Sequence, residues 1–463
     1  MHGRIDGMDQ SALAELVSSL PDGVVVTDPG TTEKYRVDRS QDAGAGLPAV
    51  VVRAEDATHV QTAVRWAARH RVPVVPRGAG SGLSGGSSAV DGGLVLSLER
   101  MRAIEIDTDC QVAVVEPGAF NAEVKAAAAE HGLWYPPDPS SYEFCSIGGN
   151  IATNAGGLCC VKYGVTVDYV LGLDVVLADG TLITLGGRRI KDVAGLPLLK
   201  LVVGSEGTLG VVTRAILRLV PAQSARSTMV ATFPTVEAAA RAVVAVRRSM
   251  RPSMLELMDR ASINAVEDYR PRGLDRSAGA LLVAQSDAPG VARSDEVELM
   301  RTACEAAGAT EVFVTDDADE GEMFVEARRI AIPAIEATGA LLMLEDVGAP
   351  VPLLPALLAA IEEVAAAYDI RIPVIAHAGD GNTHPIVVYE AGDAEAEKRA
   401  QAAFREVMQR AIDLGGTITG EHGVGRTKKE LLPAQLGPDV MALTRRIKDA
   451  LDPDGILNPG AVL

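Results

Sequence analysis

A glycine-rich segment between two short apolar segments limits the possible folds of this chain more than any other feature. Gly80-Ser-Gly-Leu-Ser-Gly85 follows a predicted strand, Val72–Val75, and matches the G-x-G-x-x-G pattern of dinucleotide-binding loops. In a Rossmann fold that loop must open a helix whose N-terminus faces the pyrophosphate. Here Ser87–Gly93 is again rich in turn residues, and Leu94 begins another predicted strand. The sequence therefore argues against a Rossmann site, and the loop needs another explanation.

Three glycine-rich tracts occur in the first half of the chain: Arg77–Gly86, Ser146–Gly157 and Gly204–Gly210. Glycine lets a backbone approach a ligand closely and leaves amide groups exposed toward an anion. A single tract of this kind would be interpreted as a tight turn, and that alternative stays open for each one. Three tracts separated by β segments, with Pro137-Asp-Pro-Ser-Ser141 between them, favour one large bound dinucleotide.

The pattern of apolar residues changes near Pro221. Before it, short β-like segments dominate, with a helix predicted after the capping residue Asp56 and a hairpin at Asp179-Gly180. After it, strands alternate with amphipathic helices, which predicts an α+β layer with an antiparallel sheet covered by helices. The strands expected there are Thr228–Phe233, Met254–Met258, Leu281–Ser286, Glu311–Thr315, Leu341–Asp346 and Ile372–His377, and the helices are Val236–Arg248, Val291–Ala307, Leu353–Tyr368 and Val440–Ala450.

Three of the seven histidines lie in two short motifs, His377-Ala-Gly-Asp-Gly-Asn-Thr-His384 and Gly420-Glu-His-Gly-Val-Gly425. Neutral imidazoles with a carboxylate form a common ligand set for Zn²⁺ and related divalent ions. Gly379 and Gly381 allow a sharp turn, so both rings of the first motif could converge on one point. On spacing alone the signal is weak, and solvent-facing turns whose histidines cap backbone groups stay open as the alternative.

Net charge and cysteine content narrow the class of protein. Lysine and arginine number 43 against 62 acidic residues, which gives a formal net charge of −19 and argues against a nucleic-acid partner. Five cysteines without a C-x-x-C pair favour reduced thiols over a disulfide framework. No signal peptide or apolar run of about 18 residues is visible, so we expect a cytoplasmic protein, with peripheral attachment at the inner face of a membrane left open.

The glycine-rich tracts and the proline segment also resemble those of a known family. The segments Pro76–Gly85, Pro137–Ser141, Ser146–Asn150, Asn154–Gly157 and Gly204–Gly207 resemble the FAD-binding domain of the vanillyl-alcohol oxidase superfamily. Within it, the chain is most similar to the D-2-hydroxy-acid dehydrogenases, namely the glycolate oxidase FAD subunit, flavin D-lactate dehydrogenase and D-2-hydroxyglutarate dehydrogenase. The similarity runs from about residue 46 to the C-terminus, with the motifs in family order.

The resemblance implies a fold and a cofactor. It predicts an α+β protein with a leader (1–45), a two-part FAD-binding domain of the PCMH type (46–222), a substrate domain (223–415) and a C-terminal segment returning to the flavin (416–463). FAD would be noncovalent, because the first loop lacks the histidine that tethers flavin in some relatives. The residues implied to bind it are Pro76, Arg77, Gly78, Ala79, Gly80, Ser81, Gly82, Ser84, Pro137, Asp138, Ser140, Ser146, Gly148, Gly149, Asn150, Asn154, Gly156, Gly157, Glu206, Gly210 and Asn458.

The resemblance likewise assigns the chemistry to the histidine motifs. His377, His384 and Glu421 match the family's metal ligands, with Zn²⁺ expected and Mn²⁺ or a similar ion as the alternative. His422 matches the base that removes the hydroxyl proton while hydride passes from C2 of the 2-hydroxy acid to flavin N5. Arg328 matches the residue that binds the substrate carboxylate, although a solvated helix face would also explain an arginine pair at Arg328-Arg329.

Two departures from the hydroxyglutarate branch concern the substrate. Where that branch has a lysine two residues before Asp346, this chain has Leu344, and where it has an asparagine two residues after His384, this chain has Ile386. Both changes remove partners for a second carboxylate. The expected substrate is therefore a small or apolar 2-hydroxy monocarboxylate, such as glycolate, D-lactate or a longer D-2-hydroxy acid.

Alternatives for the function stay open within this resemblance. An oxidase that passes electrons to O₂ or acts on another alcohol is one, and a flavin subunit within a larger glycolate oxidase complex is another. The electron acceptor could be a quinone, a cytochrome, an electron-transfer flavoprotein or an iron–sulfur subunit, and the chain itself has no iron–sulfur cysteine spacing. A homodimer is also compatible with the sequence.

Overall fold

The computed structural model describes residues 10–40 and 42–463, which form two compact units. The first unit comprises the described residues up to 156, residues 165–222 and residues 421–463, and the second comprises residues 157–164 and 223–420. Part of the expected leader, residues 1–9 and 41, lies outside the described residues. The last 43 residues of the chain (421–463) thus belong to the first unit.

A small sheet forms one part of the first unit. Its strands, in spatial order, are β1 (Val25–Val26), β2 (Val50–Arg53), β4 (Leu94–Ser97) and β3 (Val74–Arg77), with β2, β4 and β3 parallel. The predicted helix is α3 (Ala57–His70), and Asp56 caps it by accepting a hydrogen bond from the His59 amide. Its buried face includes Trp66, whose indole N–H donates to the Ala12 carbonyl of α1 (Gln10–Ser19) at 2.7 Å. This face joins the core of the sheet.

The connection from β3 to β4 contains no helix, although the two strands are parallel. The expectation that the first glycine tract does not open a helix is therefore confirmed. The chain crosses between the strands as an irregular loop whose backbone amides are not committed to helical hydrogen bonds.

An antiparallel sheet forms the other part of the first unit. Its strand order is β5 (Ile104–Asp107), β6 (Val112–Val115), β10 (Val211–Arg218), β8 (Val170–Val176) and β9 (Leu182–Gly186). The predicted Asp179-Gly180 hairpin joins β8 to β9. A two-stranded ribbon, β7 (Leu133–Trp134) with β11 (Val220–Pro221), accompanies it. The other helices of the unit are α2 (Pro29–Thr32), α4 (Asn121–Ala129), α5 (Ile147–Thr153), α7 (Leu198–Val202), α15 (Leu432–Leu436) and α16 (Pro438–Leu451).

The second glycine tract differs from the expected loop. Its first half is the helix α5, and Ser146 caps it by accepting a hydrogen bond from the Gly149 amide at 3.3 Å. Two glycines lower helix propensity by about 1 kcal/mol each, which is why the sequence suggested a loop. The cap and the burial of Ile147 and Ile151 favour the helix despite that cost.

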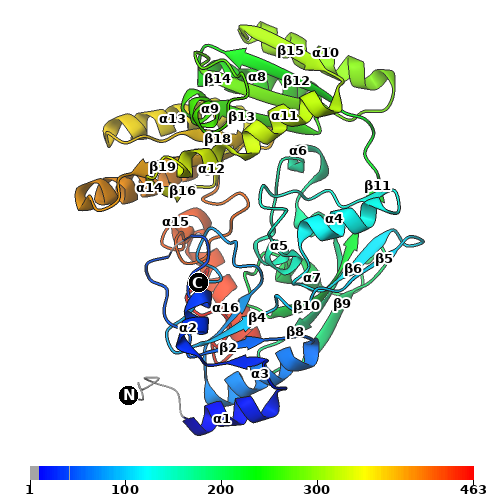
Figure 1. The fold of residues 1–463 in the computed structure, drawn as a ribbon, viewed down its shortest axis with the longest axis vertical. Coiled ribbons are helices and arrows are strands. Elements are labelled where there is room, and N and C mark those ends of the chain that lie inside the picture. The colour runs from blue at the N-terminus through cyan, green and yellow to red at the C-terminus, as the bar shows by residue number, and fades with distance from the viewer. Residues whose placement is uncertain (1–9, 41) are drawn as a thin grey trace. The chain divides into compact units, whose positions relative to one another are not determined.

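The second unit is built on one large antiparallel sheet. Its strands, in spatial order, are β15 (Glu311–Thr315), β12 (Ser227–Phe233), β14 (Ala280–Ser286), β13 (Met254–Asp259), β18 (Val374–His377), β19 (Asn382–Tyr389) and β16 (Leu341–Leu344), and β17 (Val347–Gly348) also pairs with β19. The helices are α6 (Cys160–Tyr163), α8 (Val236–Ser249), α9 (Arg260–Tyr269), α10 (Val291–Ala306), α11 (Ala318–Arg329), α12 (Ala331–Glu336), α13 (Leu354–Ala367) and α14 (Ala394–Asp413), with α13 and α14 side by side (Figure 1).

Helices α9, α11 and α12 pack on the face of this sheet that carries Val230, Met258 and Val283. Most expected strands match the structure, and β15 matches residue for residue. The strand expected to continue to Asp346 ends at Leu344, and β19 was not among the expected strands. Among the described helices, none combines the length and apolar content that crossing a bilayer requires. All five cysteines lie within the described residues, and none of them forms a disulfide there.

Candidate functional site

The first glycine tract is held from inside by Arg77. Its guanidinium donates hydrogen bonds of 3.0 Å to the carbonyls of Ser87 and Val37, so this side chain braces the loop itself. Burial lowers the pKa of Arg77, partly offset by the nearby carboxylate of Asp38. Gly80 has φ +69°, and a Cβ there would lie 2.3 Å from the guanidinium. The loop therefore curls around its own arginine.

The loop and α5 are joined through one hydroxyl. Ser146 Oγ accepts the amide of Ala79 at 3.2 Å in addition to that of Gly149. A Cβ on Gly78 would lie 2.2 Å from this oxygen, so only glycine allows the approach. The first and second glycine tracts are thus in direct contact, as a site wrapped around one ligand requires.

The amides of the first tract fit an anionic ligand. No described residue accepts a hydrogen bond from the amides of Gly80, Ser81, Gly82 or Leu83, and all four residues are at least partly shielded from solvent. Successive unbonded amides of this kind form an anion-binding concavity. This part of the chain fits the pyrophosphate of FAD.

Glu206 ties the third tract to the C-terminal segment. Its carboxylate accepts hydrogen bonds from the amides of Val424 (2.7 Å) and Gly425 (2.9 Å). Burial raises the pKa of Glu206 to about 7, against the lowering effect of these two bonds and of Lys428. Ser84 Oγ also donates to the carbonyl of His422 at 3.0 Å. The first and third tracts therefore both hold the backbone of the second histidine motif itself.

Asn458 connects the same segments. Its side-chain amide donates to the carbonyls of Gly86 and Glu206, both at 2.7 Å, and its backbone amide donates to Val74 in β3. The C-terminal segment, for which a return to the flavin is predicted, contacts β3 and the first and third glycine tracts. The donors of Asn458 are used within the protein, which makes it a brace of this region.

The remaining residues predicted to bind FAD are spread more widely. Asn121 Nδ2 donates to the carbonyl of Pro137 and to Asn150 Oδ1, which links the proline segment to α5. Gly210 packs against β8, where a Cβ would lie 2.5 Å from a methyl of Val175. Gly157 belongs to the second unit. All the other positions predicted to bind FAD lie in the first unit. Those not yet described are Pro76, Asp138, Ser140, Gly148, Asn154 and Gly156.

The first histidine motif is a strand–turn–strand unit rather than an exposed turn. His377 ends β18 and His384 lies in β19, opposite Ile375. Gly381 has φ +86°, and a Cβ there would lie 2.2 Å from the Ala349 carbonyl, so the turn requires glycine. The ring centroids of the two histidines are 5.0 Å apart with an interplanar angle of 89°. The predicted convergence of the rings is confirmed.

Both rings are buried, each residue being 3% exposed, and in both Nδ1 faces a protein oxygen. His377 Nδ1 is 2.9 Å from Glu256 Oε1, and His384 Nδ1 is 3.3 Å from the Glu345 carbonyl. This leaves Nε2 as the nitrogen on the far side of each ring, and metal-binding histidines are oriented by such contacts. A buried pair of histidines with fixed rings fits a divalent metal.

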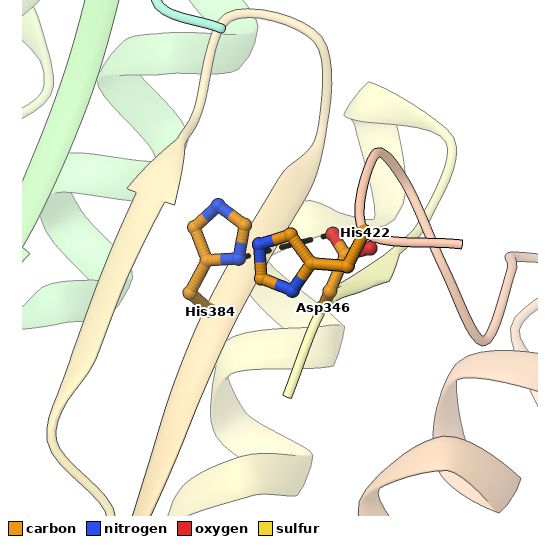
Figure 2. A group of neighbouring side chains, drawn as sticks. All are labelled: Asp346, His384 and His422. Carbon is orange, nitrogen blue, oxygen red and sulfur yellow. Dashed lines mark ion pairs between the residues drawn. The ribbon is translucent and has the colours of Figure 1, made fainter. Parts of the chain in front are cut away.

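Sequence reasoning missed two buried acids beside these histidines. Glu256, in β13, contacts His377 and also Arg328, with 2.9 Å between Glu256 Oε2 and Arg328 Nη2. Asp346 Oδ1 lies 3.8 Å from His384 Nδ1 (Figure 2). A negative charge inside an apolar strand, as in Met254-Leu-Glu-Leu-Met258, is the one signal that could have revealed Glu256.

Asp346 fixes the backbone that leads into the second histidine motif. Its Oδ2 accepts hydrogen bonds from Thr419 Oγ1 at 2.7 Å and from the Gly420 amide at 2.9 Å. Gly420 directly precedes Glu421 and His422, the latter also labelled in Figure 2. Glu421 Oε1 is 4.0 Å from His422 Nε2, and both side chains are largely buried. Arg328, at the predicted helix end, is the last residue but one of α11 and is buried.

Comparison with known proteins identifies the class. A family model described as "FAD binding domain" matches residues 48–186, and one described as "FAD linked oxidases, C-terminal domain" matches residues 222–462. The chain belongs to the FAD-linked oxidase family, and it is an FAD-dependent oxidoreductase with the predicted α+β fold.

Individual relatives show which members of the family this chain is similar to. Glycolate oxidase subunit GlcD of Bacillus subtilis (strain 168) is 41% identical over 416 residues, 89% of this chain and 88% of that protein. D-lactate dehydrogenase of Archaeoglobus fulgidus is 36% identical over 442 residues, 93% of this chain and 96% of that protein. Among solved structures, 4-ethylphenol oxidase from Gulosibacter chungangensis has a TM-score of 0.81 at 19% identity, covering 99% of this chain and 98% of the other, which shows a shared fold.

Proposed function

We propose that this flavoprotein oxidises a small D-2-hydroxy monocarboxylate, such as glycolate or D-lactate, to the 2-oxo acid. The observation that carries the proposal is the buried pair His377 and His384, with Nδ1 of each ring facing a protein oxygen. The names of the relatives, a glycolate oxidase subunit and a D-lactate dehydrogenase, support the same substrate class. FAD is bound noncovalently, since the first glycine tract contains no histidine.

His377, His384 and Glu421 hold a divalent metal, with Zn²⁺ favoured by the two imidazoles and one carboxylate. Chain connectivity supports the third ligand. Asp346, whose carboxylate lies beside His384, binds the Gly420 amide, and Glu421 is the next residue. When bound, the metal lowers the pKa of the substrate hydroxyl.

His422 removes the hydroxyl proton of the substrate. A neutral imidazole titrates in the range where this transfer is efficient. FAD, when bound, accepts the hydrogen on C2 together with its electron pair. The C2 hydrogen with its electron pair and the hydroxyl proton taken by His422 together account for the two protons and two electrons that the substrate loses. Ser84 and Glu206 hold the backbone at this base and just after it, through the His422 carbonyl and the Val424 amide.

Arg328 binds the substrate carboxylate. A guanidinium matches a carboxylate in geometry and keeps its charge when buried. Its position near the end of α11 agrees with the role that the family resemblance implies.

The size and polarity of the substrate are limited by Leu344 and Ile386. These two residues are direct partners across β16 and β19. Because side chains alternate along a strand, Ile386 shares a face of β19 with His384. Ile386 is fully buried in a cluster with Ile335 and Val388, and Leu344 packs against it, so neither member of this pair offers a partner to a second carboxylate. We therefore assign monocarboxylates rather than 2-hydroxydicarboxylates as substrates.

An anaerobic titration followed in the visible spectrum tests the proposal. Purified protein with bound flavin is mixed with D-lactate, glycolate, D-2-hydroxybutyrate and D-2-hydroxyglutarate, beside the L forms of the chiral acids. Bleaching by the D monocarboxylates and by glycolate is expected. Bleaching by L acids, or by none of them, would contradict the substrate class. Readmitting air then separates the two kinds of enzyme, because immediate recovery of the flavin absorbance would favour an oxidase that uses O₂.

Removal of the metal tests the role that we propose for it. His377→Ala should lower metal content and abolish flavin bleaching by substrate, while the flavin spectrum without substrate stays that of the parent protein. A metal-free protein that is bleached at the full rate would contradict the role given to the metal.

A further inference from the structure

Glu256 occupies an unusual place in the second unit. It lies in the middle of β13 and is 1% exposed, with leucines on both sides in sequence. Side chains alternate across a strand, so Glu256 shares the face of Met254 and Met258, which packs on α9, α11 and α12. A carboxylate in such a core is unfavourable unless charged or hydrogen-bonding partners surround it.

The two oxygens of Glu256 have different partners. Oε1 is 2.9 Å from Nδ1 of His377, and Oε2 is 2.9 Å from Nη2 of Arg328. Backbone register sets the first contact, because β13 and β18 pair Leu257 with Ala376, and one step further along brings Glu256 opposite His377. The second contact comes from the last turn of α11.

We propose that Glu256 is a positioning residue that orients the metal ligand His377 and the substrate-binding residue Arg328 with one carboxylate. This rests on the proposed function of both residues. By accepting the Nδ1 hydrogen of His377, Glu256 fixes the tautomer and ring angle that present Nε2 to a metal. By pairing with Arg328, it sets the direction in which the remaining guanidinium N–H groups point.

A purely structural role for Glu256 makes a different prediction. If the carboxylate only neutralised a buried arginine, its loss would lower thermal stability without a specific effect on metal affinity. The shared carboxylate instead couples the two sites. Loss of Glu256 should weaken metal binding and raise the KM for substrate more than it lowers kcat.

The test compares Glu256→Gln with the matched control Glu267→Gln. Glu267 is a buried acid of the same unit, and its carboxylate accepts the amides of Arg272 and Leu274, away from the histidines. Zn²⁺ affinity is measured on the FAD-loaded proteins by competition with a chromogenic chelator, alongside melting temperature, kcat and KM. We expect Glu256→Gln to lower Zn²⁺ affinity by about 10- to 100-fold, and Glu267→Gln to lower the melting temperature only.

Each outcome decides the point. Equal Zn²⁺ affinity in Glu256→Gln and the parent would overturn the inference while leaving the proposed function intact. A parent protein that binds no Zn²⁺ or Mn²⁺ would overturn both. Should Glu256→Gln fail to retain flavin, Glu256→Asp keeps the charge but shortens the side chain. For it, a loss of Zn²⁺ affinity at an unchanged melting temperature supports the inference, and unchanged affinity overturns it.

Discussion

Asp346 accepts a hydrogen bond of 2.9 Å from the backbone amide of Gly420, the residue before Glu421. The same carboxylate oxygen accepts the Thr419 hydroxyl, and the other oxygen lies 3.8 Å from His384. One buried acid thus connects a histidine of β19 to the segment that carries the second histidine motif. Misplacing a reacting group by about 1 Å can cost about 100-fold in rate.

Replacing Asp346 by asparagine should therefore lower kcat by about 10- to 100-fold, with bound FAD retained. Thr419→Val, which removes only one of the two hydrogen bonds to Oδ2, should have a smaller effect. Asp413→Asn, at an exposed acid at the end of α14, serves as the control. Steady-state kinetics of the three variants check that the loss of kcat decreases from Asp346→Asn to Thr419→Val to the control, and their flavin spectra check that FAD is retained. Equal kcat in Asp346→Asn and the control would contradict the anchoring role.

Close contact between the first two glycine tracts gives a second prediction. A Cβ on Gly78 would lie 2.2 Å from Ser146 Oγ, so Gly78→Ala should separate the loop from α5 and reduce FAD occupancy. Ser146→Ala loses the helix cap, worth about 1 kcal/mol, but leaves room for the new methyl group. We expect the double variant to bind more FAD than Gly78→Ala alone, measured as flavin absorbance per protein after purification. An additive loss in the double variant would show that the steric account is wrong.

Burial of Glu206 predicts a pH dependence of stability. Its pKa rises to about 7 from an ordinary value of 4.5, chiefly through burial, so the folded state holds this proton more tightly than the unfolded state. The favourable contribution is complete below about pH 4.5 and is lost as the pH rises to about 7, an effect of about 3 kcal/mol. The Glu206→Gln variant lacks this titration.

Melting temperatures of Glu206→Gln and the parent, recorded from pH 4.5 to 8, check the sign. The parent should be the more stable of the two by the widest margin at the acidic end, and the margin should shrink toward pH 7. A margin that grows with rising pH would mean that the two amide hydrogen bonds outweigh burial.

Much of the fold could be predicted because local signals and tertiary packing agree. Asp56 caps α3 as its sequence position indicated, and the apolar strand Glu311–Thr315 appears with the expected bounds. Disagreement arose where packing overrides a local preference. Pro385 lacks a backbone N–H and disfavours a strand, yet it lies within β19, between two pairing neighbours.

In the candidate site, too, some residues could be predicted from local sequence and others depend on tertiary packing. Its histidines could be named from two short motifs, because few other residue types combine in that way. Glu256 and Asp346 could not be, since their roles depend on strand register and on a contact with Gly420 that lies 74 residues away in sequence. Pairing between distant strands is specified by the whole core, and no local pattern reports it.

Leu344 and Ile386 provide the last prediction, because their direct pairing across β16 and β19 makes them a unit. The double variant Leu344→Lys/Ile386→Asn supplies a charge and an amide on the face of β19 that carries His384. It should gain activity on D-2-hydroxyglutarate and lose activity on D-lactate, seen as a change in the ratio of the two kcat/KM values. Leu342→Lys is the matched control, because Leu342 pairs with Val388, which lies two residues further along β19 from His384 than Ile386 does. If the control shifts the ratio equally, a general charge effect rather than this pair would determine the preference.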